Sequence, residues 1–201
     1  DIKEEEEGKR RMELSFLQVQ INPHFINNTL FNIRCLIDSG NDREAAHIVS
    51  SLAKMLNMTM RDPQRFIPLS EELDIIGNYV DLMRYRYYDK VIILECDADD
   101  ICLGAMIPKM ILQPIVENSI FHGFGDQIEE LRIHISARKL GDKLIIRCLD
   151  NGVGIPPGKI AEIQSPGFLA KRAFNNIGLR NVRDRVHLIY GNDCGLSIDS
   201  A

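Results

Sequence analysis

The sequence lacks several patterns that would define its class at once. It has no apolar run of about 18 or more residues, the minimum for a membrane-spanning helix, and no recognisable signal peptide. Its five cysteines are scattered without a CxxC pair, which argues against a zinc site or a disulfide framework. The net charge of −5 argues against a general nucleic-acid-binding protein, which is usually basic.

The common phosphate-binding signatures are also missing. The chain contains no P-loop, and its glycine-rich stretch 150–155 does not satisfy the GxGxxG pattern of dinucleotide-binding folds. What is present is the composition of an ordinary soluble globular protein, with 45% hydrophobic and 26% charged residues. A length of 201 residues accommodates one large domain or two small ones.

The first part of the chain is predicted to be a helical hairpin. Apolar residues recur with helical spacing from residue 9 to about 38 and again from about 43 to 61, and Gly40-Asn41-Asp42 lies between the two segments as a turn signal. Such a hairpin buries too little apolar surface alone, so we expect it to dimerise into a four-helix bundle.

The second part is predicted to be a mixed α+β domain. Its first helix is expected to start within the segment Pro68–Leu73, with Ser70 as N-cap, and to run to about Tyr87. Strands are expected at 91–96, 131–138, 143–149 and 195–199, and further helices at 107–121 and 177–190. Residues 158–174 show no clear period. We therefore expect a hairpin domain over 1–65 and a two-layer α/β domain over 66–201.

His24 is the first candidate for chemistry. It follows Pro23 inside a stretch that otherwise reads as one helix, where proline removes an amide donor and clashes with the preceding turn. On a helix Gln20 and Asn28 share its face, and uncharged neighbours allow a neutral, nucleophilic imidazole near pH 7. The alternative is a partly buried, hydrogen-bonded structural histidine.

A second candidate is the segment Gln113–Gly123, where Glu117, Asn118 and His122 place polar groups in an apolar helix. Asn118 and His122 are four residues apart and share a face, and an amide oxygen is a reasonable ligand for Mg²⁺ beside substrate phosphates. The alternative is a helix with one polar face.

Two glycine-containing motifs follow. Asp150 ends a predicted strand and could accept a hydrogen bond from an amino group such as that of adenine, while Gly152 and Gly154 allow close approach of the backbone to a ligand. Gly178 begins a helix that carries several arginines, an arrangement that binds phosphate well. An ordinary Asn-Gly turn and a basic solvent-facing helix are the alternatives.

Together the motifs NPHF, ENSIFHG, DNGVGI and NIGLRNVRDR, in this order, resemble those of sensor histidine kinases. The closest resemblance is to the LytS-like branch of the GHKL superfamily, and it covers nearly the whole chain. It implies a Bergerat-type ATP-binding sandwich after a dimerisation hairpin. It also implies a homodimer, a response regulator as partner, no nucleic acid, and a cytoplasmic domain that reaches a membrane only through upstream segments.

The resemblance also implies roles for particular residues. His24 would be the phosphoacceptor, with Gln20 and Asn28 beside it, and Pro23 would loosen the helix so that His24 can meet the ATP domain. Asn118 would coordinate Mg²⁺ and Asp150 would bind adenine, with a lid from about 154 to 176. The remaining residues expected around ATP are Glu117, His122, Gly152, Gly154, Gly178, Leu179 and Arg180.

Two other functions remain open from the sequence. One is a regulatory ATP-binding module in which His24 is inert, and the other is a serine-directed kinase of the same superfamily, which would not need the Pro-His motif. A gyrase-like ATPase is disfavoured because Pro114 lies one turn before Asn118, where a basic carboxylate would be needed.

Overall fold

The computed structural model describes residues 23–60, 66–125, 128–164 and 177–200. Its contacts divide the chain into two compact units, Asp1–Pro63 and Gln64–Ala201, and each is described by itself. No helix within the described residues is long and apolar enough to cross a membrane.

The first unit is an antiparallel hairpin of α2 (Pro23–Asp38) and α3 (Asp42–Met60). The chain reverses at Gly40, whose φ of 79° suits glycine, and the amide of Asn41 donates to the carbonyl of Leu36. One helical stripe is buried between the two helices and includes Ile33, Ala45, Ile48 and Leu52. Four large apolar side chains elsewhere on the hairpin are about half exposed or more: Leu30, Phe31, Ile37 and Val49. The predicted helices are confirmed over the described residues, and Gln20 lies outside them.

The second unit is built on a three-stranded sheet in the order β2-β4-β5. Strand β2 (Val91–Ala98) runs parallel to β4 (Glu130–Leu140), and β4 is antiparallel to β5 (Lys143–Asp150), with Gly141 at positive φ in the hairpin turn. Strands β1 (Phe66–Pro68) and β3 (Met106–Pro108) form a separate antiparallel pair, and the short helix α5 (Asp100–Leu103) lies between β2 and β3 in the chain.

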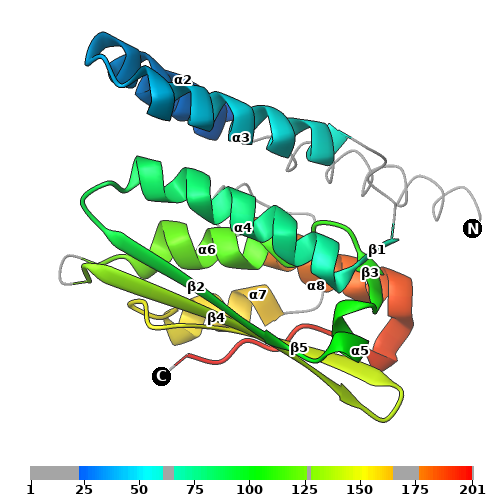
Figure 1. The fold of residues 1–201 in the computed structure, drawn as a ribbon. Coiled ribbons are helices and arrows are strands. Elements are labelled where there is room, and N and C mark those ends of the chain that lie inside the picture. The colour runs from blue at the N-terminus through cyan, green and yellow to red at the C-terminus, as the bar shows by residue number, and fades with distance from the viewer. Residues whose placement is uncertain (1–22, 61–65, 126–127, 165–176, 201) are drawn as a thin grey trace, which may run out of the picture. The chain divides into compact units, whose positions relative to one another are not determined.

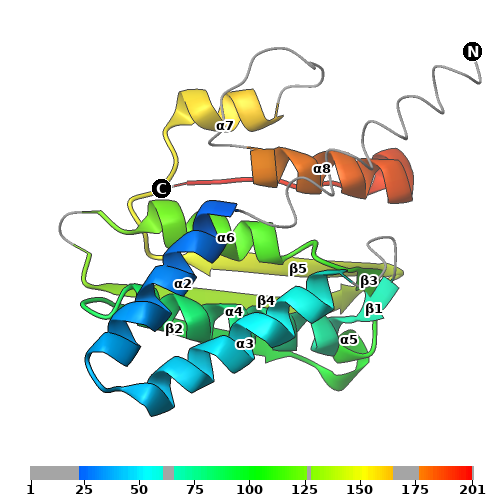
Figure 2. The same cartoon turned by 90° about the horizontal axis from the view of Figure 1, so that it is seen from above.

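Helices α4 (Leu69–Arg86) and α6 (Gln113–Gly123) pack on one face of this sheet, and α8 (Ile177–Tyr190) packs against α6 (Figures 1 and 2). Helix α7 (Pro157–Gln164) contacts α8, and the 3-10 helix η1 (Gly191–Asp193) follows α8. The core lies between helices and sheet, where Leu131, Ile133 and Ile135 of β4 meet Ile76 and Met83 of α4 and Ile120 of α6, all buried. The expected α+β architecture, a helical hairpin followed by an α/β domain, is confirmed.

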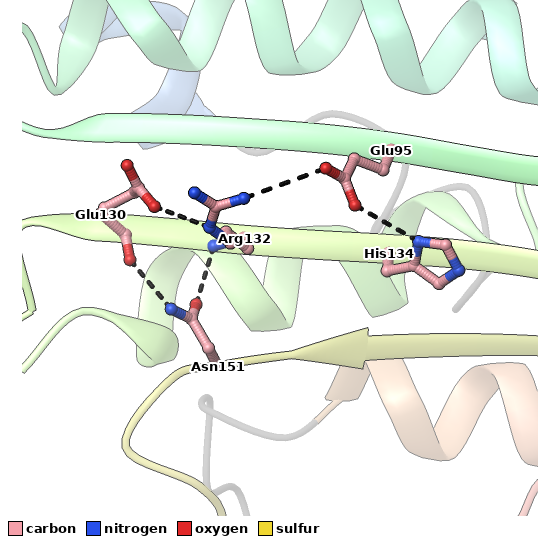
Figure 3. Close-up of polar contacts among 5 residues, drawn as sticks. All are labelled: Glu95, Glu130, Arg132, His134 and Asn151. Carbon is pink, nitrogen blue, oxygen red and sulfur yellow. Dashed lines mark hydrogen bonds and ion pairs between the residues drawn. The ribbon is translucent and has the colours of Figure 1, made fainter.

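On the other face of the sheet the side chains of β4 are polar, because side chains alternate along the strand (Figure 3). The neighbouring strands expose apolar side chains on the same face, namely Val91, Ile145 and Leu149. Arg132 donates to Glu130 at 2.6 Å and lies 4.0 Å from Glu95 of β2, which in turn lies 3.5 Å from His134. These are exposed pairs and contribute little to stability. These pairs give the charged side chains partners of opposite charge on a face that the described helices do not cover.

Three details of the predicted secondary structure were wrong, and one helix lies where no element was predicted. The helix expected over 107–121 begins only at Gln113, because residues 106–108 pair as β3 with β1. Helix α4 begins at Leu69 after Pro68 and has no side-chain cap, so Ser70 is not its N-cap. Residues 195–199 are extended but form no strand, and the aperiodic stretch after 157 contains helix α7.

Candidate functional site

A small cavity lies beside α6 in the second unit. Asn118 and His122, one turn apart on α6, line it. They are joined by residues from the loop after β5 and from α7: Gly154, Ile155, Pro156, Lys159 and Ile163. Partial burial and the nearby charge of Lys159 lower the pKa of His122, so its imidazole is neutral at pH 7. The cavity therefore combines an amide, a neutral imidazole and an ammonium group, which suits a polar, anionic ligand.

The carboxylate of Asp150 is held in place at the end of β5. The hydroxyl of Ser119, on α6, donates to its Oδ2 at 2.6 Å, and the amide of Gly152 donates to its Oδ1 at 3.0 Å. Each oxygen keeps a further lone pair, because a carboxylate oxygen accepts more than one hydrogen bond. Asp150 can thus accept from a ligand amino group while α6 and the loop fix its orientation.

Asn151 shapes the loop that follows (Figure 3). Its Oδ1 accepts from the amide of Arg132 at 2.7 Å, and its Nδ2 donates to the carbonyl of Glu130 at 3.1 Å. The side chain therefore continues the β4–β5 pairing beyond Asp150, and the backbone is free to turn toward α6. There the amide of Val153 donates to the carbonyl of Gly123 at the end of α6.

Gly152 is required by the close contact between this loop and α6. A Cβ added at Gly152 would lie 2.6 Å from Cα of Gly123 and 3.0 Å from its carbonyl oxygen. Both are backbone atoms that cannot rotate away, so no larger side chain fits. Gly154 has a φ of 76°, a conformation that favours glycine, and it lines the cavity directly.

The fourth motif begins α8 beside α6, outside the cavity lining. A Cβ at Gly178 would lie 3.4 Å from Cβ of Pro114, so a small residue here allows α8 to approach α6 closely. Leu179 is buried in the core. Arg180 is one-third exposed and lies 3.9 Å from Asp184 on its own helix. Residues 165–176, most of the expected lid, lie outside the described residues.

Glu117 faces α4 and is absent from the described lining of the cavity. Gln113 donates to its carboxylate at 2.9 Å, and its charge acts on the buried Tyr79 of α4. Burial raises the pKa of Glu117 from 4.5 to about 7, against the opposing effect of the bond from Gln113. Glu117 is thus held in the helix interface, next to the cavity-lining Asn118 but on another side of α6.

This elevated pKa predicts a pH-dependent stability. Because the folded-state pKa exceeds the unfolded one, Glu117 contributes stability that is complete below pH 4.5 and is lost as pH rises through about 7. We expect the Glu117→Gln variant to avoid this loss. Its free energy of unfolding relative to wild type should therefore be about 3 kcal/mol higher at pH 8 than at pH 4. Urea unfolding followed by tyrosine fluorescence measures it, since all five tyrosines lie beyond residue 63.

The control for this experiment is Glu129→Gln, which removes an exposed carboxylate of the same unit. Its stability should follow wild type at every pH. Parallel pH profiles for wild type and Glu117→Gln would contradict the assigned pKa.

Two residues near the site carried no clear signal in the sequence. Lys159 is an isolated lysine in a stretch without recognisable period, and α7 brings it to the cavity. Ser119 is a small polar residue on the buried face of α6, and its role depends on Asp150, 31 positions further along the chain. Neither could be identified without the tertiary structure.

The groups that line the cavity fit a magnesium ion that is coordinated mainly by the phosphate oxygens of a bound ligand and by water. Among the described residues no group of three or more His, Cys, Asp or Glu could hold a metal ion. Asn118 offers one amide oxygen, and Mg²⁺ commonly takes one or two protein oxygens and completes its shell with phosphate oxygens and water.

His24 lies in the first turn of α2 as described, directly after Pro23. The predicted kink involves residues before 23, outside the described part, and remains a prediction. His24 is therefore placed on the hairpin, and its chemistry rests on the sequence motif.

Comparison with known families agrees with this organisation. Residues 12–91 match the family described as "Histidine kinase", and residues 105–198 match "Histidine kinase-, DNA gyrase B-, and HSP90-like ATPase". The chain belongs to the sensor histidine kinase family, and its second unit is an ATP-binding domain of that kind.

Individual relatives place it among sensor kinases that include LytS. It is 34% identical over 95% of its length to "Sensor histidine kinase YesM" of Bacillus subtilis, of which it covers 31%, and 30% identical over 95% to "Sensor protein LytS" of Staphylococcus saprophyticus, of which it covers 32%. The chain thus spans about a third of the length of these relatives. A histidine kinase domain from Erythrobacter litoralis covers 96% of this chain, which covers 88% of that domain, with a TM-score of 0.46 and 15% identity.

Proposed function

We propose that this chain is the ATP-dependent kinase core of a two-component sensor, with His24 as phosphoacceptor. The observation that carries the proposal is the cavity in which Asn118 and His122 of α6 meet Gly154 and Lys159, beside a fixed Asp150. We assign these residues to the two ends of ATP, and the family match supports ATP as the ligand. The Pro23-His24 motif on the hairpin supplies an acceptor.

In the proposed reaction a ring nitrogen of neutral His24 attacks the γ-phosphorus of ATP. A P–N bond forms as the bond from phosphorus to the bridging oxygen breaks, ADP leaves, and the imidazole proton is released to solvent. Phosphoryl transfer depends mostly on positioning and charge stabilisation rather than on covalent help from the protein. Gln20 and Asn28 are proposed to orient the imidazole.

The nucleotide is proposed to bind with adenine on Asp150 and its phosphates toward Asn118, His122 and Lys159. Mg²⁺, held through Asn118, would neutralise charge on the phosphates. Gly152 and Gly154 shape the loop, and Gly178, Leu179 and Arg180 are assigned to the start of α8 near the triphosphate. Glu117 is assigned to holding α6 against α4, because its carboxylate lies in that interface.

We further propose that the hairpin, over 1–65, forms a four-helix bundle with a second copy. Its exposed apolar side chains, among them Leu30 and Phe31, would be covered in that dimer. The ATP-binding domain, over 66–201, is proposed to lie in the cytoplasm as part of a membrane-anchored sensor. An aspartate of a response regulator would receive the phosphoryl group from His24.

The test is incubation of the chain with Mg²⁺ and ATP labelled at the γ-phosphate. We expect label on the protein that is lost in acid and retained in alkali, as for phosphohistidine. ATP binding without labelling would favour a regulatory module instead. Acid-stable label would favour a serine-directed kinase.

A further inference from the structure

Glu72 is a carboxylate with no solvent exposure in a helix interface. It lies in the first turn of α4, and its side chain is 0% exposed although Ser70, two residues earlier, is open to solvent. Its Oε2 accepts from the amide of Met110 at 2.7 Å and its Oε1 from the amide of Leu112 at 3.0 Å. Both oxygens of one buried side chain are therefore used to hold backbone of a distant segment.

That segment, residues 109–112, leads directly into α6 and is named here the α6 lead-in. Leu112 is the N-cap residue of α6 and offers no side-chain hydrogen bond, and Pro114 stands in the first turn. Amides at the start of a helix lack partners within it, so buried ones need acceptors from elsewhere. Glu72 meets this need in place of a local cap, and its negative charge suits the positive end of the α6 dipole.

The backbone of the α6 lead-in is also strained. Met110 has a φ of 58°, and no other non-glycine residue in the described ranges has a positive φ. A side-chain-bearing residue keeps this conformation only when its surroundings impose it. The bond from the amide of Met110 to Glu72 is such a constraint.

Arg185 holds the α6 lead-in from the opposite helix. It lies on α8, and its guanidinium donates to the carbonyl of Lys109 at 2.6 Å. Burial lowers the pKa of Arg185, and the charge of Glu72 opposes this shift, so the two side chains act on one another across the segment. Burial likewise raises the pKa of Glu72, and the hydrogen bonds from the backbone amides oppose this shift.

We propose that Glu72 and Arg185 are positioning residues that fix the start of α6, and through it the place of Asn118 and His122 in the ATP cavity. The proposal rests on the proposed function insofar as that cavity binds ATP. A helix transmits displacement of its first turn along its axis, and Asn118 lies less than two turns from Leu112. Binding groups must be held to within a fraction of an ångström to act on phosphates.

Glu72→Gln in the full chain is the direct test. Glutamine keeps the size of the side chain but presents one donor group to a backbone amide, so one bond to the α6 lead-in is lost. We expect the dissociation constant for ATP, measured with Mg²⁺ on fully folded protein, to rise about tenfold. Glu71→Gln is the matched control, because it removes the same charge from the same turn of α4 and should leave the constant unchanged.

A second readout separates positioning from a loss of stability. Amide hydrogen exchange without nucleotide should increase at Met110, Leu112 and through α6 in Glu72→Gln, and remain as in wild type for β4. The double variant Glu72→Gln/Arg185→Gln should weaken ATP binding by less than the product of the single effects, since both act on one segment. If Glu72→Gln does not fold, Arg185→Lys, which keeps one donor, should still weaken ATP binding several-fold.

The outcomes are distinct. Folded Glu72→Gln, or Arg185→Lys in its place, with wild-type ATP affinity would overturn the positioning role and leave the proposed function intact. Independent, multiplying effects of Glu72 and Arg185 would overturn their joint action. A wild-type chain that does not bind ATP would refute the proposed function, and the positioning role with it.

Discussion

Replacing His24 with glutamine is expected to reduce protein-bound phosphate to background while ATP binding remains. Glutamine resembles histidine in reach and polarity, but its amide nitrogen is not a nucleophile, so no P–N bond can form. The proposed nucleotide groups belong to the unit Gln64–Ala201, and His24 belongs to the other unit. The change should therefore remove the chemistry without altering the ATP site. Labelling from γ-labelled ATP and a parallel binding titration measure the two properties.

The matched control is His47→Gln. His24 and His47 are the two histidines in residues 1–63, and His47 lies on α3, away from the Pro-His motif. It should keep wild-type labelling. Acid-labile phosphate on His24→Gln, or its loss from His47→Gln alone, would show that the acceptor has been wrongly assigned.

Gly152→Ala is expected to have the second largest effect. The new methyl group would lie 2.6 Å from Cα of Gly123, so the loop must move away from the end of α6. Such overpacking costs about 1–3 kcal/mol. The movement would also displace Asp150, whose carboxylate accepts from the amide of Gly152. We expect lower stability by tyrosine fluorescence and ATP binding weakened at least about tenfold, a change that corresponds to about 1.4 kcal/mol.

Gly158→Ala is the control for the loss of backbone freedom that any change from glycine to alanine causes. Gly158 lies in the first turn of α7, and apart from its chain neighbours and the backbone of its own helix no atom lies within 4 Å of the position its Cβ would take. Alanine there should be neutral or slightly stabilising, since it favours the helix. Equal ATP affinities for Gly152→Ala and wild type would mean that ATP binding does not depend on the close contact between this loop and α6.

The elements that the sequence predicts well are those with a long local period. Helix α8 and the β4–β5 hairpin each carry their pattern over many residues, and both match the predicted ranges closely. Strands β1 and β3 have three residues each and exist only because Phe66–Pro68 pairs with Met106–Pro108. No local period can reveal such a pair, so residues 107 and 108 were assigned to the start of a helix.

The candidate site shows the same contrast between features with a local sequence pattern and features that depend on distant residues. Its motifs around Asn118 and Asp150 are readable as unusual polar groups in apolar surroundings, and the structure brings Asn118, His122 and Gly154 to one cavity. Lys159, Ser119 and Glu72 were not identified because their partners lie far away in the chain. Glu72, for example, follows Ser70 and Glu71 and reads as part of a polar helix start, although its two bonds reach 38 and 40 positions along the sequence.

The way Asn151 is held also bears on the chemical lifetime of the protein. An Asn-Gly pair in a mobile peptide deamidates when the glycine amide nitrogen attacks the asparagine side chain and closes a succinimide ring. Here both ends of the Asn151 side chain are bonded to β4, and the amide of Gly152 donates to Asp150 instead. The arrangement that turns the loop toward α6 thus keeps the reacting atoms apart. Ageing at this position should follow opening of the β4–β5 edge rather than proceed in the folded state.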